Sequence, residues 1–127
     1  EDSGKQLDIR QSGESREMEI YRQFFYNTAE NLFCNALRYA DSQITVDISG
    51  RDGFLFLTVT DDGPGYPASV LQKGPAFFLR DDTSGNGHLG VGLAVCRLLC
   101  EKHGGSLTLE NLQPGAKATA VFKSRNS

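Results

Sequence analysis

The feature that most constrains the fold is a helical pattern over residues 22–40, which no glycine or proline interrupts. Apolar side chains recur there at three- and four-residue spacing, the repeat that places them on one face of an α-helix. They are Phe24, Phe25, Ala29, Leu32, Phe33, Ala36 and Leu37. The pattern predicts one long helix early in the chain.

Alternating apolar and polar residues predict strands on both sides of this helix. Residues 6–10 and 17–21 flank a turn-like Ser-Gly-Glu-Ser stretch, which predicts an antiparallel hairpin before the helix. The remaining predicted strands are residues 44–48, 54–59, 106–110 and 116–122. The first two of these four are joined by a glycine-containing turn at residues 50–53.

The second half of the chain adds helices and a glycine-rich break. Pro67 opens a short predicted helix over residues 67–72. A long loop is expected over residues 73–89, followed by a second long helix over about 89–103 that ends at a Gly-Gly pair. Strands and helices therefore interleave, which indicates an α/β chain.

Length and charge narrow the function classes. The 127 residues suit one domain, residues 1–127, and can bury a core without disulfides or a structural metal. A net charge of −3 argues against nucleic acid or an anionic membrane as the main partner. No apolar run is long enough to span a bilayer. Because the sequence starts without Met or a signal-peptide core, we expect a piece of a longer protein.

The three cysteines are odd in number and lie in helix-patterned apolar segments. This usage predicts reduced thiols in the core, Cys34 among them, rather than a disulfide framework. Cys96, Cys100 and His103 are spaced to share one helix face, which would allow a metal ion. The paired Cys-x-x-Cys spacing of common zinc sites is missing, so we favour a core role.

A polar strip runs along the first predicted helix. Asn31, Asn35 and Arg38 follow at spacings of four and three residues, which places them on roughly one face. A solvated face is one interpretation, and it suits Arg38 well. The other is a ligand site, because an Asn oxygen suits Mg²⁺ when phosphates supply the negative charge.

Residues 61–65 (Asp-Asp-Gly-Pro-Gly) come directly after a predicted strand. Such a segment is a common tight turn in proteins that bind nothing. It also suits base recognition, because a buried Asp61 carboxylate accepts a hydrogen bond from the exocyclic amine of adenine. Guanine has an acceptor at that position, and the clash of two acceptors costs about 1–3 kcal/mol or more.

Glycines crowd residues 85–93, where the predicted loop passes into a helix. Glycines at a helix start expose backbone N–H groups and the positive end of the helix dipole, a common way to hold phosphate. Flexible linkers look similar, and the segment matches neither a P-loop nor a dinucleotide-binding motif.

In this order and spacing, the three elements resemble the Bergerat-type ATP-binding domains, and among them the sensor histidine kinases. Residues 30–40 resemble the N box, residues 61–65 the first glycine box, and residues 90–93, continued by 96–105, the second. Residues 77–80 resemble the F box. The resemblance covers nearly the whole chain. It implies an α/β sandwich with a mixed, mostly antiparallel sheet backed by about three helices.

The resemblance also implies roles for single residues. Asn35 matches the magnesium ligand, and Asp61 matches the aspartate that binds adenine. Asn31, Arg38 and Arg80 match positions that approach the phosphates, and they are the implied catalytic residues. The other positions matched to nucleotide binding are Tyr39, Gly63, Gly65, Gly90, Gly92 and Leu93. The implied cofactors are ATP and Mg²⁺.

Position 31 separates the subclasses of this superfamily. Gyrase-, chaperone- and mismatch-repair-type members carry a Glu four residues before the magnesium Asn, where it orients water, and anti-sigma serine kinases carry one there too. Here that residue is Asn31, and Glu30 lies one residue away on another part of the helix. The resemblance therefore favours phosphoryl transfer to a docked histidine over hydrolysis.

No segment resembles the box that carries a phosphoacceptor histidine, and neither His88 nor His103 is placed to serve as one. The implied partners are a separate histidine-bearing dimerisation domain and, downstream, a response regulator. The implied location is the cytoplasmic side of a membrane-anchored bacterial sensor. An anti-sigma-type serine kinase and a nucleotide-independent interaction domain remain as alternatives.

Overall fold

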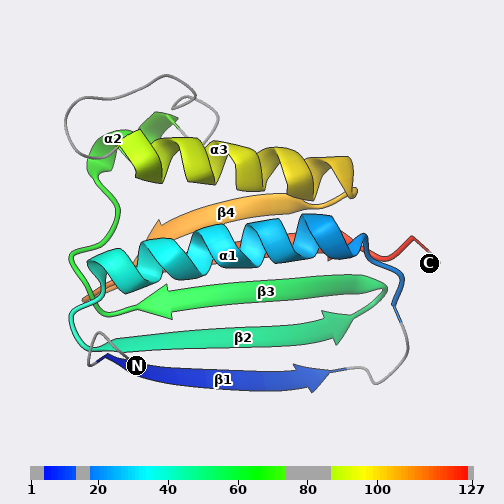
Figure 1. Cartoon of the computed structure of the whole chain (residues 1–127), viewed down its shortest axis with the longest axis horizontal. Helices are drawn as coiled ribbons and strands as arrows, with labels where there is room; N and C mark the ends of the chain where they lie inside the picture. Colours follow the sequence, from blue (N-terminus) through cyan, green and yellow to red (C-terminus); the bar gives the residue numbers. More distant parts are fainter. Residues whose placement is uncertain (1–4, 14–17, 74–86, 126–127) are drawn as a thin grey trace.

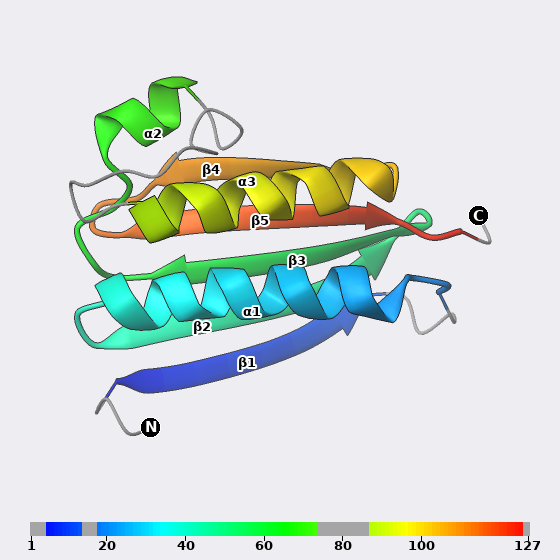
Figure 2. The ribbon, with the colours of Figure 1, turned by 45° about the horizontal axis from the view of Figure 1, so that its top comes forward.

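The computed structural model describes residues 5–13, 18–73 and 87–125. Its elements are β1 (Gln6–Gly13), α1 (Arg22–Tyr39), β2 (Gln43–Arg51), β3 (Phe54–Asp61), α2 (Ala68–Lys73), α3 (Gly87–Lys102), β4 (Ser106–Asn111) and β5 (Ala116–Lys123). The strands form one five-stranded sheet of order β1-β2-β3-β5-β4. α1 and α3 lie side by side over one face of this sheet (Figures 1 and 2). Among the strands that the structure describes, only β1 and β2 pair in parallel, so the predicted mixed, mostly antiparallel α/β sandwich is confirmed.

The predicted hairpin at the start of the chain is wrong. β1 pairs in parallel with β2, and residues 18–21 form no strand. These residues run beside the C-terminal end of the chain, where the N–H of Arg125 donates to the carbonyl of Glu19 at 2.9 Å. Parallel pairing needs a crossover connection, which α1 provides, and it places Leu7 against the core. Alternation predicts which side chains share a face of a strand, and it does not predict the neighbouring strand.

The other predicted elements are present with slightly shifted ends. A two-residue turn separates the paired residues Arg51 and Phe54, which confirms the turn between β2 and β3. α2 begins at Ala68 and α3 at Gly87, each within two residues of its predicted start. Most of the loop predicted over residues 73–89 lies outside the described residues. Within the described residues, no helix combines the length and the hydrophobicity needed to cross a membrane.

The core lies between the two long helices and the sheet. Its most buried hydrophobic side chains include Leu32, Ile44, Leu57, Leu93, Cys96, Cys100 and Phe122. Cys96 and Cys100 therefore confirm the expected buried thiols, and burial raises the pKa of each to about 12. Cys34 does not, because it is exposed on α1. Position 34 lies two residues from the core positions 32 and 36, which turns it to the opposite side of the helix.

Candidate functional site

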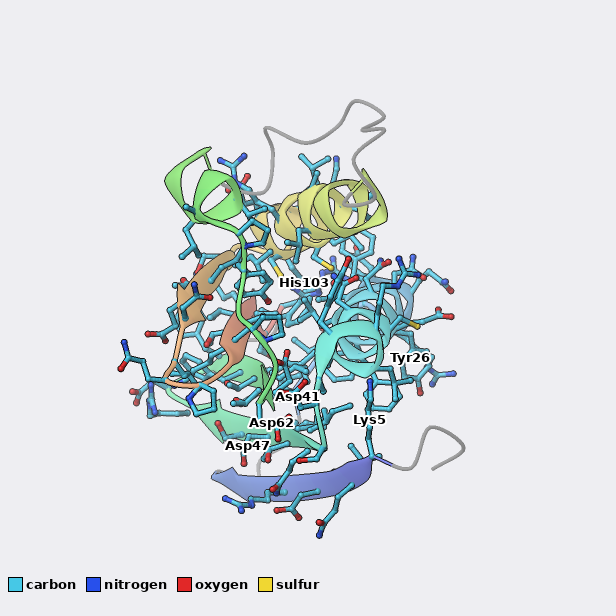
Figure 3. The ribbon with its side chains drawn as sticks, turned by 90° about the vertical axis from the view of Figure 1, so that its left-hand side faces the viewer. Lys5, Tyr26, Asp41, Asp47, Asp62 and His103 are labelled. Carbon is cyan, nitrogen blue, oxygen red and sulfur yellow. The ribbon has the colours of Figure 1, made fainter. Side chains whose placement is uncertain are left out.

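A cavity of about 340 Å³ opens between α1, the end of β3, the start of β5 and the loop after β3. It is lined by Leu32, Asn35, Ala36, Tyr39, Val59, Asp61, Pro64, Gly65, Tyr66, Pro67, Ala116 and Ala118. A mostly apolar cavity of this size with a few polar groups is typical of a small-molecule site. Figure 3 looks at the end of the molecule where α1 finishes, with Asp41 and Asp62 lying together there.

Asp61 places a carboxylate in the wall of this cavity. It is the last residue of β3 and is partly buried. Its Oδ1 accepts a hydrogen bond from the N–H of Gly63 at 2.8 Å. Burial raises the pKa of Asp61 above its usual value, and the bond from Gly63 offsets part of that rise. A carboxylate that has lost much of its water gains more than an exposed one from a donor that enters the cavity.

Gly63 and Gly65 have packing reasons to be glycine, apart from any ligand. A Cβ on Gly63 would lie 2.0 Å from the carbonyl oxygen of Tyr39, so the chain after β3 and the end of α1 are in close contact. Gly65 has a φ of +90°, and a Cβ there would lie 2.8 Å from Oδ1 of Asn111. Gly65 lines the cavity, whereas Gly63 lies behind Asp61 and fixes the direction of its carboxylate.

The three residues of the predicted polar strip on α1, Asn31, Asn35 and Arg38, do not share one environment. Asn35 lines the cavity, and its Nδ2 is buried without a hydrogen-bond partner. Asn31 donates from Nδ2 to the carbonyl of Asn27 at 2.9 Å, and its amide lies against Gly92 of α3. Arg38 is exposed in the last turn of α1. A buried amide nitrogen without an acceptor is uncommon in folded proteins, so packing within the chain alone does not account for Asn35.

Tyr66 is a cavity residue that the sequence reading missed. Burial raises the pKa of its phenol above the usual range, and the charge of Asp61 adds to the rise. The side chain of Asn111 holds its backbone at both polar groups: the Tyr66 N–H donates to Oδ1 at 2.7 Å, and Nδ2 donates to the Tyr66 carbonyl at 3.1 Å. This bond pair and the apolar contacts fix the phenol ring in the wall of the cavity.

Two small residues of β5 form another part of the wall. Ala116 and Ala118 are nearly fully buried and line the cavity, so larger side chains there would fill it. The sequence carries a signal for this: alanine alternates at positions 116, 118 and 120, where inward-facing strand positions usually hold larger apolar residues.

The remaining predicted site residues divide into three groups. Arg80 and the F-box-like residues 77–80 lie outside the described residues. Gly90 and Gly92 lie in the first turns of α3, which begins at the end of the molecule where α1 finishes (Figure 1). Leu93 is fully buried in the core and does not line the cavity. Tyr39 does line it, beside Asn35 on α1.

The structure does not support a metal site at Cys96, Cys100 and His103. The Nε2 of His103 accepts the N–H of Tyr21 at 2.9 Å, and Nδ1 lies 2.8 Å from the carbonyl oxygen of Lys123. Both ring nitrogens are therefore used. Among the residues that the structure describes, no group of three or more His, Cys, Asp or Glu could hold a metal ion.

Sequence comparison relates residues 21–126 to the family described as histidine kinase-, DNA gyrase B-, and HSP90-like ATPase. The sensor protein CseC of Streptomyces coelicolor is 37% identical over 91 residues, covering 69% of this chain and 17% of the relative. The sensor protein PhoQ of Escherichia coli K12 is 32% identical over 108 residues, covering 81% of this chain and 21% of the relative. The chain thus spans about a fifth of the length of these curated relatives.

Solved structures show the same fold. The nucleotide-free catalytic domain of the histidine kinase ThkA superposes with a TM-score of 0.81 at 19% identity, covering 97% of this chain and 82% of that one. Full-length ShkA in complex with AMPPNP gives a TM-score of 0.77 at 20% identity, covering 97% of this chain and 27% of that one. At these identities the likeness concerns the fold alone.

Proposed function

This chain belongs to the histidine kinase-, DNA gyrase B-, and HSP90-like ATPase family, and from that premise we propose that it binds Mg²⁺-ATP and supplies the γ-phosphate to a histidine on a separate dimerisation domain. One observation carries the proposal: a single cavity brings together the partly desolvated carboxylate of Asp61 and the amide of Asn35, whose Nδ2 has no hydrogen-bond partner. The first suits a base with an exocyclic amine, and the second suits a metal–phosphate group.

Adenine is the base that fits the Asp61 end of the cavity. Its exocyclic amine would donate to the carboxylate, while the rings of Tyr39 and Tyr66 offer apolar surface to the base. Guanine would place an acceptor against the same carboxylate, at a cost of about 1–3 kcal/mol. We therefore propose that Asp61 selects adenine nucleotides.

The residues present fit a Mg²⁺ ion that arrives with the nucleotide. Asn35 lines the cavity, and an amide oxygen is a neutral ligand that suits Mg²⁺ when phosphates supply the negative charge. Among the described residues, no acidic or histidine cluster could hold the ion by itself, so phosphate oxygens would complete the site. Bound Mg²⁺ would offset the negative charge that moves between phosphate oxygens during transfer.

The phosphates would lie toward the start of α3, where backbone N–H groups and the helix dipole favour anions. Gly90 and Gly92 lie in this first part of the helix, and a Cβ on Gly92 would lie 3.3 Å from Oδ1 of Asn31. We assign Arg38 and Arg80 to charge stabilisation at the outer phosphate. Leu93 supports this arrangement by anchoring α3 in the core.

The phosphoryl acceptor would come from outside this chain. His103 is buried, and both of its ring nitrogens are hydrogen bonded, so it cannot serve as the acceptor. Glu30 is exposed on α1, away from the cavity lining, and Asn31 occupies the position of the water-orienting Glu of hydrolases. Transfer to a histidine on a dimerisation domain therefore fits better than hydrolysis. A response regulator would act next, and the domain would work on the cytoplasmic side of a membrane-anchored sensor.

The first test is thermal unfolding with Mg²⁺-ADP, with Mg²⁺-GDP as the control. At about 100 times its dissociation constant, ADP should stabilise the fold by roughly 2.7 kcal/mol, an increase in the melting temperature of several degrees. GDP at the same concentration should give a much smaller shift. Equal shifts would contradict the adenine assignment, and no shift with either nucleotide would favour an interaction domain that ignores nucleotides.

A second prediction concerns Asn35→Ala. The affinity for ADP in the presence of Mg²⁺ should fall about tenfold, or ~1.4 kcal/mol, whereas the affinity measured with EDTA should change far less. Without ligand, the variant should be at least as stable as the parent, because it removes a buried amide nitrogen that has no partner. Asn27→Ala, on the same helix but outside the cavity lining, is the matched control. Isothermal titration with and without Mg²⁺ measures both, and equal losses would count against a metal-linked role.

A further inference from the structure

Asp62, the second acidic residue of the segment after β3, binds a different part of the chain from Asp61. Its Oδ1 accepts the backbone N–H groups of Asp41 at 3.0 Å, Ser42 at 2.9 Å and Gln43 at 3.0 Å. Its Oδ2 accepts the hydroxyl of Ser42 at 2.7 Å. Three consecutive N–H groups that converge on one oxygen form an anion-binding nest, here occupied by a side chain of the same protein.

This set of bonds keeps the Asp62 carboxylate ionised. The N–H and hydroxyl of Ser42, followed by the N–H of Gln43, hold the pKa of Asp62 far below its usual value. The donors come from residues 41–43, which lead from the connection after α1 into the first residue of β2. Asp41 and Asp62 lie together at this end of the molecule (Figure 3).

The segment that Asp62 holds directly follows the part of α1 that lines the cavity. Tyr39, which lines the cavity, is the last residue of α1, two residues before the first of the N–H donors. The two sequence neighbours of Asp62 also lie at this site: Asp61 lines the cavity, and Gly63 packs against the carbonyl of Tyr39. Asp62 therefore ties the end of α1 to the end of β3, next to Tyr39 and Asp61, which both line the cavity.

We propose that Asp62 is a positioning residue for nucleotide binding, which sets the separation between the Asp61 carboxylate and the Tyr39 ring. The role rests on the proposed function, because it assumes an adenine base between these walls. Without the bonds to Asp62, the end of α1 would be held at the end of β3 by the Gly63 contact and by the β2–β3 pairing that starts at Ile44 and Asp61. The distance between the exocyclic group of the base and the Asp61 carboxylate would then vary, and the preference for adenine over guanine would decrease.

The test compares Asp62→Ala with Asp41→Ala. Each variant removes one carboxylate whose charge raises the pKa of Asp61, but only Asp62 accepts the four bonds to the connection. Dissociation constants for Mg²⁺-ADP and Mg²⁺-GDP are measured well below the melting temperature of each variant. We expect Asp62→Ala to weaken ADP binding roughly tenfold and to narrow the preference for ADP over GDP at least about threefold. Asp41→Ala should keep the preference within about twofold.

Rescue by similar side chains separates positioning from general damage. The Asp62→Asn variant retains an oxygen for the three N–H groups and should recover most of the preference. Asp62→Ser can accept only part of these bonds and should lie between Asn and Ala, which also provides a reading if the Ala variant does not fold. A preference equal to that of the parent in folded Asp62→Ala or Asp62→Ser would overturn the positioning role alone. Absence of ADP binding by the unaltered chain would overturn the proposed function, and the positioning role with it.

Discussion

Replacing Asp61 with alanine should sharply reduce the stabilisation of this chain by Mg²⁺-ADP while leaving the unliganded fold intact. A hydrogen bond to a charged acceptor in a partly dry site contributes roughly 1.5–3 kcal/mol, so the dissociation constant for ADP should rise at least about tenfold and up to about 150-fold. Burial of the Asp61 carboxylate is unfavourable without a ligand, as its raised pKa indicates. The stability lost with the Gly63 hydrogen bond should therefore be offset by relief of that burial.

Differential scanning fluorimetry and isothermal titration with Asp61→Ala measure both parts of this prediction. Asp47→Ala is a suitable control, because Asp47 lies on β2 outside the cavity lining and its removal makes the same change in net charge. It should bind ADP like the parent. Unchanged ADP affinity in a folded Asp61→Ala variant would contradict the assignment of Asp61 to adenine binding.

The elements that sequence reasoning predicts well are those set by local patterns. The uninterrupted apolar repeat of residues 22–40 produces α1, and the alternation and turn residues of 43–61 produce the β2–β3 hairpin. The parallel partner of β1 could not be predicted in this way, because the pairing depends on how α1 crosses the sheet. Residues 18–21 look like a strand, but Glu19 bonds to Ser124 and Arg125 near the C-terminal end, and the N–H of Tyr21 bonds to His103.

The candidate site shows a similar division. Asp61 and Asn35 stand out because their residue types, spacing and family resemblance all point to a ligand, and both line the cavity. Tyr66 and Ala118 carry no such chemical signal, because shape rather than chemistry makes them part of the wall. Gly63 is matched to nucleotide binding by the family resemblance, whereas in the structure the close approach of the Tyr39 carbonyl already requires a glycine there.

The structural role of His103 could not be predicted from the sequence. It follows α3 directly, at the far end of that helix from the cavity, and it looks from the sequence like a helix-end residue with a weak metal signal. In the structure it is buried, and it joins the segment before α1 to the last strand. Its ring also packs edge-on against three aromatic rings, with centroid distances of 5.4 Å to Tyr21, 5.9 Å to Phe24 and 5.9 Å to Phe122.

His103→Ala should accordingly be one of the most destabilising single substitutions in this chain. It removes a buried ring from an aromatic cluster and leaves the N–H of Tyr21 and the carbonyl of Lys123 without their partner. Loss of a buried aromatic side chain costs about 3–5 kcal/mol, a large share of the roughly 5–15 kcal/mol that stabilises a domain. The melting temperature should fall by roughly 10–20 °C. Chemical denaturation of parent and variant gives the free energy difference directly.

Two further variants identify the source of this loss. The His103→Phe variant keeps an aromatic ring but provides neither hydrogen bond, so it should lose about 1–3 kcal/mol, less than the alanine variant. Lys102→Ala, at the neighbouring exposed position, should stay within about 0.5 kcal/mol of the parent. Because His103 does not line the cavity, the folded fraction of each variant should still gain stability from Mg²⁺-ADP. A His103→Ala variant within 1 kcal/mol of the parent would contradict the prediction, since neither the ring contacts nor the two hydrogen bonds could then contribute at the expected strength.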